Sequence, residues 1–308
     1  MRRTFVVGCP RSGTTIVQAL LARHPAIYTL PETAFFEQLH GDLEWRWGDV
    51  RAKAGKRRWR HRLGLARKRD REFFSALQQQ LSSGHTPSPR PPLFRAALTE
   101  HFTAMLDRSA AAEGRSMWLE KTPNHLLYIA EIEAQLANAR FIHVIRRGAD
   151  VLASLADVYL RFENDLAFGG GTVHWTRRWN RAIQIHGQHV GRANHHFVFL
   201  EDLIRHPEAE WNRLCTFLEL PPDAPLDNAC QQTIANLNHE PWKVSAIHGQ
   251  VREATRKVDG LFGPDLQRWL DVHLASYDDL HAQCQASQPH RPSPRLRVVR
   301  DTRAMGVG

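Results

Sequence analysis

Short apolar runs alternate with segments of helical periodicity along most of the chain. Several extended runs are each followed by a segment whose apolar residues recur every three or four positions. The extended runs are residues 4–7, 27–30, 117–119, 141–145 and 197–200. Strands that alternate with helices predict a parallel sheet covered on both faces. We therefore expect an α/β fold of three layers, with a central parallel sheet flanked by helices.

The stretch between the second and third extended runs has no strand pattern. Residues 40–116 contain helical patterns over 72–81 and 93–112, and we expect them to form a helical insertion. The pattern predicts one domain over residues 1–285. The remaining residues, 286–308, are rich in Pro and Arg, and we expect a disordered tail.

The basic charge of the chain is concentrated in one segment. The net charge is +9, but residues 46–71 contain twelve Lys and Arg against two Asp, so the remaining 29 basic and 30 acidic residues balance at −1. Three interpretations stay open: attraction of an anionic or sugar-bearing acceptor, peripheral contact with anionic lipid, and a solvated helix face. Nucleic-acid binding is disfavoured, because no known binding module is present.

Composition otherwise predicts an ordinary globular protein. Hydrophobic residues make up 42% of the chain. The four cysteines are scattered without a CxxC pair, which favours reduced thiols and a cytoplasmic location. Because a strand is predicted over residues 4–7, we expect no signal peptide. No apolar run approaches the length of a transmembrane helix.

A glycine-containing loop joins the first strand to the first helix. Its sequence is Gly8-Cys9-Pro10-Arg11-Ser12-Gly13-Thr14-Thr15. Backbone N–H groups converge at such a loop and the helix dipole favours an anion, although an ordinary turn has the same pattern. The loop is P-loop-like but lacks the Gly-Lys-Ser/Thr ending, and the later strands end in Glu120 and Arg146, not in a Mg²⁺-binding Asp. A P-loop nucleotide kinase or NTPase would need both of these missing features, and we keep this class of enzyme only as an alternative function.

A second anion site is indicated further along the chain. Arg146 follows the strand 141–145, and Ser154 lies eight residues on, about two helical turns away. Ligands of open α/β sheets bind beyond the carboxyl ends of the strands. The loops 8–13, 120–124 and 146–149 all fall at such ends.

Together these motifs resemble those of the sulfotransferases that use 3′-phosphoadenosine-5′-phosphosulfate (PAPS). The first loop resembles their 5′-phosphosulfate loop, Pro-Lys/Arg-Ser-Gly-Thr-Thr, and residues 144–154 resemble their 3′-phosphate motif. Residues 200–221 resemble a Glu-Asp-Leu strand end and the helix after it, and residues 120–125 resemble a motif of the bacterial and Golgi-type branches, which include the tyrosylprotein sulfotransferases. The resemblance extends over residues 4–221.

The resemblance implies transfer of a sulfuryl group from PAPS to an acceptor hydroxyl. It places the 3′-phosphate on Arg146 and Ser154. It places the 5′-phosphosulfate on the loop residues Pro10, Arg11, Ser12, Gly13, Thr14 and Thr15. Sulfate carries less charge than phosphate, so we expect no metal ion. The acceptor stays open among a glycan, a glycolipid, a peptide and a small molecule.

The resemblance also implies the catalytic groups. Arg11 takes the position of the cation that stabilises the leaving oxygen, and Lys121 is a second candidate, unless it is merely an exposed lysine. Glu32 is the expected base, because related enzymes with a Pro-Glu-Thr pattern have a catalytic glutamate there; otherwise it is a helix N-terminal acid. His125 is the rival base, since cytosolic sulfotransferases use a histidine.

Two regions depart from the family pattern. Leu200 stands where the family often has Tyr. The C-terminal third is difficult to align, and its candidate donor contacts are Lys243, Ser245, Arg252, Arg256 and Lys257. Acceptor-binding residues are expected from the insertion and from this C-terminal third.

Overall fold

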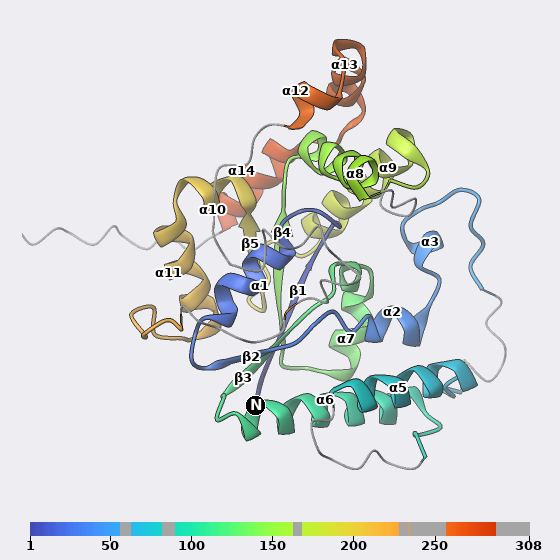
Figure 1. Cartoon of the computed structure of the whole chain (residues 1–308), viewed down its shortest axis with the longest axis vertical. Helices are drawn as coiled ribbons and strands as arrows, with labels where there is room; N and C mark the ends of the chain where they lie inside the picture. The colour runs from blue at the N-terminus through green and yellow to red at the C-terminus, as the bar shows by residue number, and fades with distance from the viewer. Residues whose placement is uncertain (56–62, 82–89, 163–167, 228–233, 235–256, 288–308) are drawn as a thin grey trace, which may run out of the picture.

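A five-stranded parallel sheet forms the centre of the computed structural model, as Figure 1 shows. Its spatial order is β2-β3-β1-β4-β5, and every neighbouring pair is parallel. The strands are β1 (Arg2–Gly8), β2 (Ile27–Thr29), β3 (Met117–Lys121), β4 (Ala139–Ile145) and β5 (His195–Phe199). The expected α/β class is confirmed. The structure describes residues 1–55, 63–81, 90–162, 168–227, 234 and 257–287.

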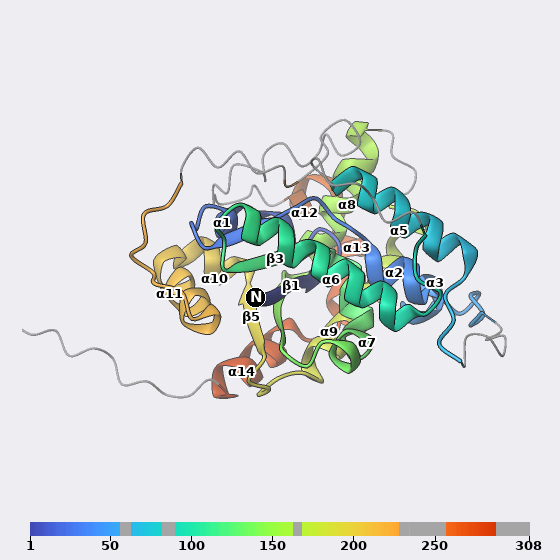
Figure 2. The same cartoon turned by 90° about the horizontal axis from the view of Figure 1, so that it is seen from below.

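Helices cover both faces of the sheet because its strands are apolar on both sides. In β1, Val6 packs on one face while Phe5 and Val7 pack on the other. The Val6 face is covered by α1 (Thr14–Ala22), α10 (Leu200–Arg205) and α11 (Pro207–Leu218). The opposite face is covered by α6 (Arg95–Ala112), η1 (Pro123–Tyr128), α7 (Ile129–Gln135), α9 (Gly171–Gly187) and α14 (Tyr277–Ser287). Figure 2 shows α11 and α7 on opposite sides of the sheet.

The segment between β2 and β3 is helical, as expected, and packs into the main core. Its helices are α2 (Phe35–His40), α3 (Leu43–Arg46), α5 (Lys68–Leu81) and α6. The ring of Phe35 from α2 stacks on Phe102 from α6, with centroids 4.0 Å apart. Phe36 of α2 meets Phe5 of β1 edge-on, with centroids 5.9 Å apart, so buried aromatic contacts also join this segment to the sheet.

Part of the basic segment is structural. Arg46 donates to the carbonyl of Leu127 at 2.8 Å and lies 4.4 Å above the ring of Tyr128. Trp47 is only 1% exposed. These residues hold α3 against η1, so the solvated-face interpretation fails for them. Residues 56–62 lie outside the described part of the chain.

Some predicted boundaries were wrong. β3 runs on to Lys121, beyond the expected end at residue 119. The amphipathic pattern of residues 126–136 predicts one helix, but the structure divides this stretch between η1 and α7. The sequence predicts Thr33 as the N-cap of the helix that contains Phe35, but the N-cap of α2 is Ala34. The Thr33 hydroxyl still accepts from the amide of Phe35 while it donates to a buried carboxylate on β3. The sequence pattern also predicts a helix over residues 207–218, and α11 has these bounds.

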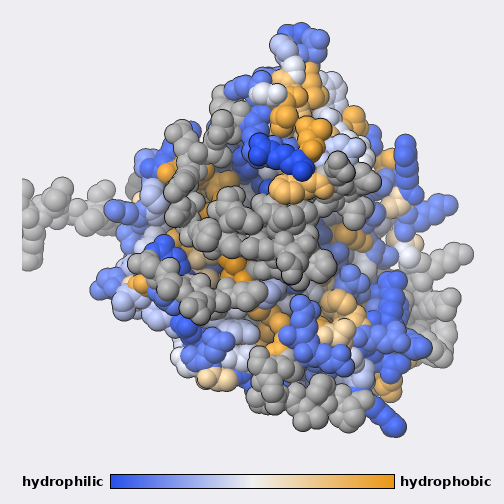
Figure 3. Space-filling model, viewed as in Figure 1, coloured by the Kyte–Doolittle hydropathy of each residue, from blue (hydrophilic) through white to orange (hydrophobic). Residues whose placement is uncertain are grey.

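The remaining helices lie at the carboxyl edge of the sheet. They are α8 (Gly148–Phe162), α12 (Lys257–Leu261) and α13 (Pro264–His273). Figure 3 shows hydrophobic residues gathered over these elements at the top of the view. The exposed apolar side chains there include Leu160, Leu261 and Val272. None of the described helices combines the length and apolar sequence that a bilayer crossing needs.

A chain of buried histidines links α9, β4, β5 and α7. His143 Nδ1 lies 2.8 Å from His186 Nδ1, and His143 Nε2 lies 2.8 Å from His195 Nδ1. His195 Nε2 in turn lies 3.1 Å from Glu133 Oε1. Burial opposes ionisation of Glu133, but hydrogen bonds from Asn194, His195 and Arg192 outweigh it and lower its pKa.

The ionised Glu133 determines the proton positions along this chain. A carboxylate only accepts hydrogen bonds, so His195 must donate from Nε2 and accept at Nδ1. His143 must then donate from Nε2 and accept at Nδ1, and His186 must donate from Nδ1. Each ring is neutral in this arrangement. Burial holds the pKa of His143 well below its ordinary value, and lowers the pKa of His186 to about 3 and that of His195 to about 4.

We expect this chain to make stability fall in acid. The unfolded histidines bind protons below about pH 6.5, whereas the folded ones resist protonation until far lower pH. The free energy of unfolding should therefore fall as pH drops from about 6.5 toward 4, by up to ~1.4 kcal/mol per pH unit for each histidine. His143→Phe should reduce this slope. His101→Gln, which replaces an exposed histidine of α6, should not. Urea unfolding between pH 7.5 and 4.5 measures the slopes, and equal slopes for wild type and His143→Phe would contradict the expectation.

Candidate active site

The loop after β1 has the geometry of an anion-binding turn. Arg11 and Gly13 both have positive φ, at 72° and 99°. A Cβ at Gly13 would lie 2.9 Å from Leu200, so glycine is required for both conformation and space. Leu200 thus packs directly beneath the loop, at the position where the resemblance led us to expect Tyr. The loop brings the amides at the start of α1 to the carboxyl edge of the sheet.

Cys9 within this loop is not an available nucleophile. Its side chain is 1% exposed, and burial raises the pKa of the thiol to about 12 although the charge of Arg178 acts in the opposite direction. The thiol therefore stays protonated at neutral pH. Cys215 and Cys284 are also free and buried.

The two predicted anion sites adjoin one another. Arg11 Nε donates to Ser154 Oγ at 3.2 Å, and Arg146 donates to the carbonyl of Arg11 at 3.4 Å. β1 and β4 are neighbours in register, with Gly8 opposite Val144, so the loops that follow them meet. Burial lowers the pKa of Arg146, while Asp150 and Glu201 oppose the shift. Two guanidinium groups and a hydroxyl therefore converge beside the start of α1.

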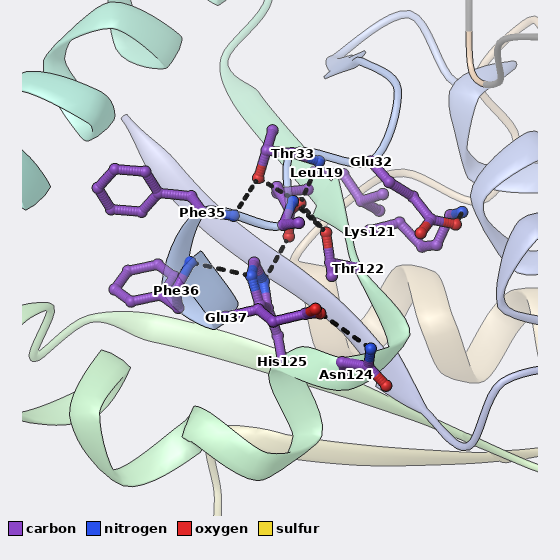
Figure 4. A network of polar contacts seen from close by, with 12 residues as sticks. Glu32, Thr33, Phe35, Phe36, Glu37, Leu119, Lys121, Thr122, Asn124 and His125 are labelled. Atoms are coloured by element: carbon purple, nitrogen blue, oxygen red, sulfur yellow. Dashed lines mark hydrogen bonds and ion pairs between the residues drawn. The ribbon is translucent and has the colours of Figure 1, made fainter. Parts of the chain in front are cut away.

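A buried carboxylate that sequence reasoning missed organises the neighbouring strand end. Glu120 in β3 is 0% exposed. Its Oε1 accepts from Thr122 Oγ1 at 2.6 Å, and from the hydroxyl and amide of Thr33 at 2.8 and 3.2 Å. Burial opposes ionisation, but His125, Thr122 and Thr33 outweigh it and lower the pKa of Glu120. Figure 4 shows this network, which joins the segment after β2 to the end of β3.

Glu32 and Lys121 form an ion pair next to this network. Lys121 Nζ donates to Glu32 Oε1, and the lysine side chain is 0% exposed while that of Glu32 is 28% exposed. Lys121 is therefore not the exposed surface lysine of the alternative interpretation. Figure 4 shows the pair to one side of the polar network. Lys121 lies beside Val6 of β1 in the sheet, two residues before the glycine that begins the anion-binding loop.

The structure gives His125 a different environment from Glu32. The ring is fully buried, Nδ1 lies 2.9 Å from Glu120 Oε2, and the amide of Phe36 donates to Nε2 at 3.2 Å. Nε2 is therefore the unprotonated nitrogen, and Nδ1 donates to Glu120. Both ring nitrogens have protein partners, which leaves neither open to an acceptor hydroxyl.

A second carboxylate, Glu37, lies near the ion pair and was also missed. Asn124 Nδ2 donates to Glu37 Oε2 at 2.9 Å. Burial raises the pKa of Glu37, with further contributions from Glu32 and Glu44, while Asn124 and His125 oppose the shift. These residues were visible in the sequence, but only the fold brings the two segments together, so that Glu32 contacts Lys121 and Glu37 contacts Asn124.

The C-terminal candidates are mostly outside the described residues. Lys243, Ser245, Arg252 and Arg256 fall there. Lys257 is described, and it pairs with Asp157 of α8. Within the described part of the chain, no group of three or more His, Cys, Asp or Glu side chains is arranged to hold a metal ion.

Comparison with known proteins gives one family and a set of similar structures. A model described as the sulfotransferase family matches residues 4–224. Protein-tyrosine sulfotransferase A of Caenorhabditis elegans is 26% identical over 226 residues, 71% of this chain and 50% of the relative. The chain therefore spans about half the length of that curated relative.

Two solved structures share the fold. A sulfotransferase domain from the curacin biosynthetic pathway has a TM-score of 0.51 at 17% identity, over 94% of this chain and 98% of the other. Mouse sulfotransferase SULT7A1, complexed with PAP, has a TM-score of 0.50 at 12% identity, over 92% of this chain and 89% of the other. At these identities the likeness concerns the fold alone.

We expect Glu120→Gln to destabilise the protein and disturb the site. Glutamine retains one acceptor oxygen but directs an amide at groups that already donate, so buried donors lose their partner. The expected loss is about 2–3 kcal/mol of unfolding free energy. Urea unfolding measures it, with Glu113→Gln on an exposed carboxylate as the matched control. Equal stability of Glu120→Gln and wild type would show that the network is dispensable.

Proposed function

The chain belongs to the sulfotransferase family, and on that premise we propose that it transfers a sulfuryl group from PAPS to an acceptor hydroxyl. The observation that carries the proposal is the contact between Arg11 and Ser154 beside Arg146. It unites a helix-start anion site with a second cationic site at one sheet edge. A nucleotide with anionic groups on both its 5′ and 3′ positions fits this arrangement.

In the proposed complex, the donor binds along the carboxyl ends of β1 and β4. The loop amides and the hydroxyls of Ser12, Thr14 and Thr15 hold the 5′-phosphosulfate. Arg146 and Ser154 hold the 3′-phosphate. Arg11 lies between the two sites and supplies positive charge to the phosphate oxygen from which sulfur departs.

The proposed reaction is an in-line displacement at sulfur. Glu32 accepts the proton of the acceptor hydroxyl while that oxygen forms a bond to sulfur. The bond between sulfur and the bridging phosphate oxygen breaks, and 3′,5′-bisphosphoadenosine (PAP) leaves with the electron pair. The products are the sulfated acceptor, PAP and a protonated Glu32 that returns its proton to water.

In the proposal Lys121 acts first on the base, Glu32, and then on the group that develops negative charge. Its ammonium group is buried against Glu32, and a nearby cation favours the ionised form that a base requires. When the proton moves to Glu32, the ammonium group is released from its strongest pairing. It can then stabilise the negative charge that builds on the bridging oxygen as PAP leaves.

His125 is assigned a positioning role instead of the role of base. Its bonds to Glu120 and to the amide of Phe36 connect the segment that contains Glu32 with the one that contains Lys121. The acceptor itself stays open among glycan, glycolipid, peptide and small molecule. Because one relative is a protein-tyrosine sulfotransferase, a tyrosine-containing peptide belongs in the first panel of acceptors.

We expect Glu32→Gln to separate chemistry from donor binding. Transfer of ³⁵S-labelled sulfate from PAPS should fall at least about a hundredfold, because the base is lost. Affinity for PAP, measured by calorimetry, should be unchanged. Glu113→Gln is the matched control, and normal turnover in Glu32→Gln would exclude Glu32 as the base.

Arg146→Ala should show the opposite pattern. Loss of a charge-assisted contact to the 3′-phosphate should weaken PAP binding about a hundredfold. Arg161→Ala, at the exposed end of α8, removes the same kind of side chain away from the site and should bind PAP normally. ATP with Mg²⁺ is the competing ligand. A protein that prefers ATP-Mg²⁺ to PAP would refute the proposed function.

A further inference from the structure

The loop that follows β4 is attached to a carboxylate on α10. The amide of Arg147, immediately after Arg146, donates to Glu201 Oε1 at 2.9 Å. On the other side of the peptide, the indole of Trp179 donates to the carbonyl of Arg146 at 3.1 Å. The peptide group between Arg146 and Arg147 is therefore held by one hydrogen bond at its N–H and another at its carbonyl.

The same carboxylate is held by the first residue of α14. Tyr277 Oη donates to Glu201 Oε2 at 2.6 Å, and Tyr277 is 7% exposed. The guanidinium of Arg147 lies 4.5 Å above the Tyr277 ring and 2.9 Å from Asp278 Oδ1. One tyrosine thus contacts both the carboxylate and the residue beside Arg146.

Close packing joins the loop to the C-terminal segment at a second point. A Cβ at Gly148 would lie 2.8 Å from the Leu274 side chain and 2.9 Å from Trp179. Such distances are shorter than side chains tolerate, so Gly148 lets the start of α8 approach the residues before α14. The loop and the C-terminal segment are therefore in direct contact at Tyr277 and at Leu274.

The start of α14 is itself anchored independently of the loop. Asn180 on α9 accepts from the amide of Ala275 and donates to the carbonyl of His273, both at 2.8 Å. His281, one turn into α14, lies 2.6 Å from Asp202 Oδ2. Tyr277 therefore lies on a segment that is also held by contacts with α9 and α10, outside the loop.

We propose that Glu201 and Tyr277 are positioning residues for the donor's 3′-phosphate. Through the Arg147 amide they set the direction in which Arg146 leaves the sheet, and so the distance between its guanidinium and Ser154. This inference rests on the proposed use of PAPS. It extends the functional part of the chain to α14, beyond the residues 4–224 that match the family.

The hydrogen bond from Tyr277 to Glu201 suits a positioning role, because the tyrosine hydroxyl keeps its proton. Burial, together with the adjacent Glu201, raises the pKa of Tyr277 far above its ordinary value. The hydroxyl therefore stays protonated and donates at every pH at which the protein functions. Tyr277→Phe removes this single hydrogen bond and preserves the ring that packs under Arg147.

The test compares two nucleotides that differ only in the 3′-phosphate. Calorimetry on the full chain measures affinity for PAP and for adenosine 5′-monophosphate (AMP). Tyr277→Phe should weaken PAP binding about tenfold, as for the loss of one supporting hydrogen bond, and leave AMP binding unchanged. At saturating PAPS, kcat should be unchanged while the KM for PAPS rises.

Two further variants make the result decisive. Glu201→Gln retains an acceptor for the Arg147 amide but loses the charge, so PAP binding should fall less than tenfold, again without change for AMP. Tyr128→Phe removes a comparable hydroxyl bond, 2.8 Å to the carbonyl of Gly41, and should change neither affinity. Equal losses for PAP and AMP in Tyr277→Phe, or no loss, would overturn the inference. A wild-type protein that does not bind PAP would instead refute the proposed function.

Discussion

The geometry of the site depends on one buried carboxylate. Glu120 lies inside β3 with no exposure to solvent, where an unsatisfied charge would be costly. Its oxygens are satisfied by Thr122 and His125, which follow it closely in the chain, and by Thr33, which lies 87 residues earlier. Satisfying the carboxylate therefore forces the residues after β2 against the residues after β3, and this contact brings Glu32 to Lys121.

The order of the strands determines which loops meet. β3, β1 and β4 are neighbours in the centre of the sheet, so the loops at their carboxyl ends form one continuous edge. The chain leaves β1 toward one side of the sheet and later returns to β4 on the other, the kind of switch point at which ligands of parallel sheets bind. Arg11, Ser154 and Arg146 meet there, while Lys121 enters from the adjacent strand.

Several charged groups near this edge have local partners. Lys121 pairs with Glu32, Arg178 with Glu44, and Glu201 with the Arg147 amide and Tyr277. Each pairing fixes a side chain whose entropy would otherwise oppose an ordered site. The site is thus preorganised by contacts that reach from the residues after β2 to α14, and most of these contacts join residues more than fifty positions apart.

Local sequence was sufficient to predict the alternation of strands and helices, the helices between β2 and β3, and the glycine-containing loop between β1 and α1, because periodicity and glycine placement act over a few residues. The pairing of Arg146 with Ser154 as a phosphate site stays a prediction, while the structure places Arg11 in contact with both residues. The burial of Lys121, the bonded state of His125 and the role of Glu120 did not follow. These properties depend on which strands become neighbours, and that order is decided by packing among distant segments, which no local pattern in the chain records.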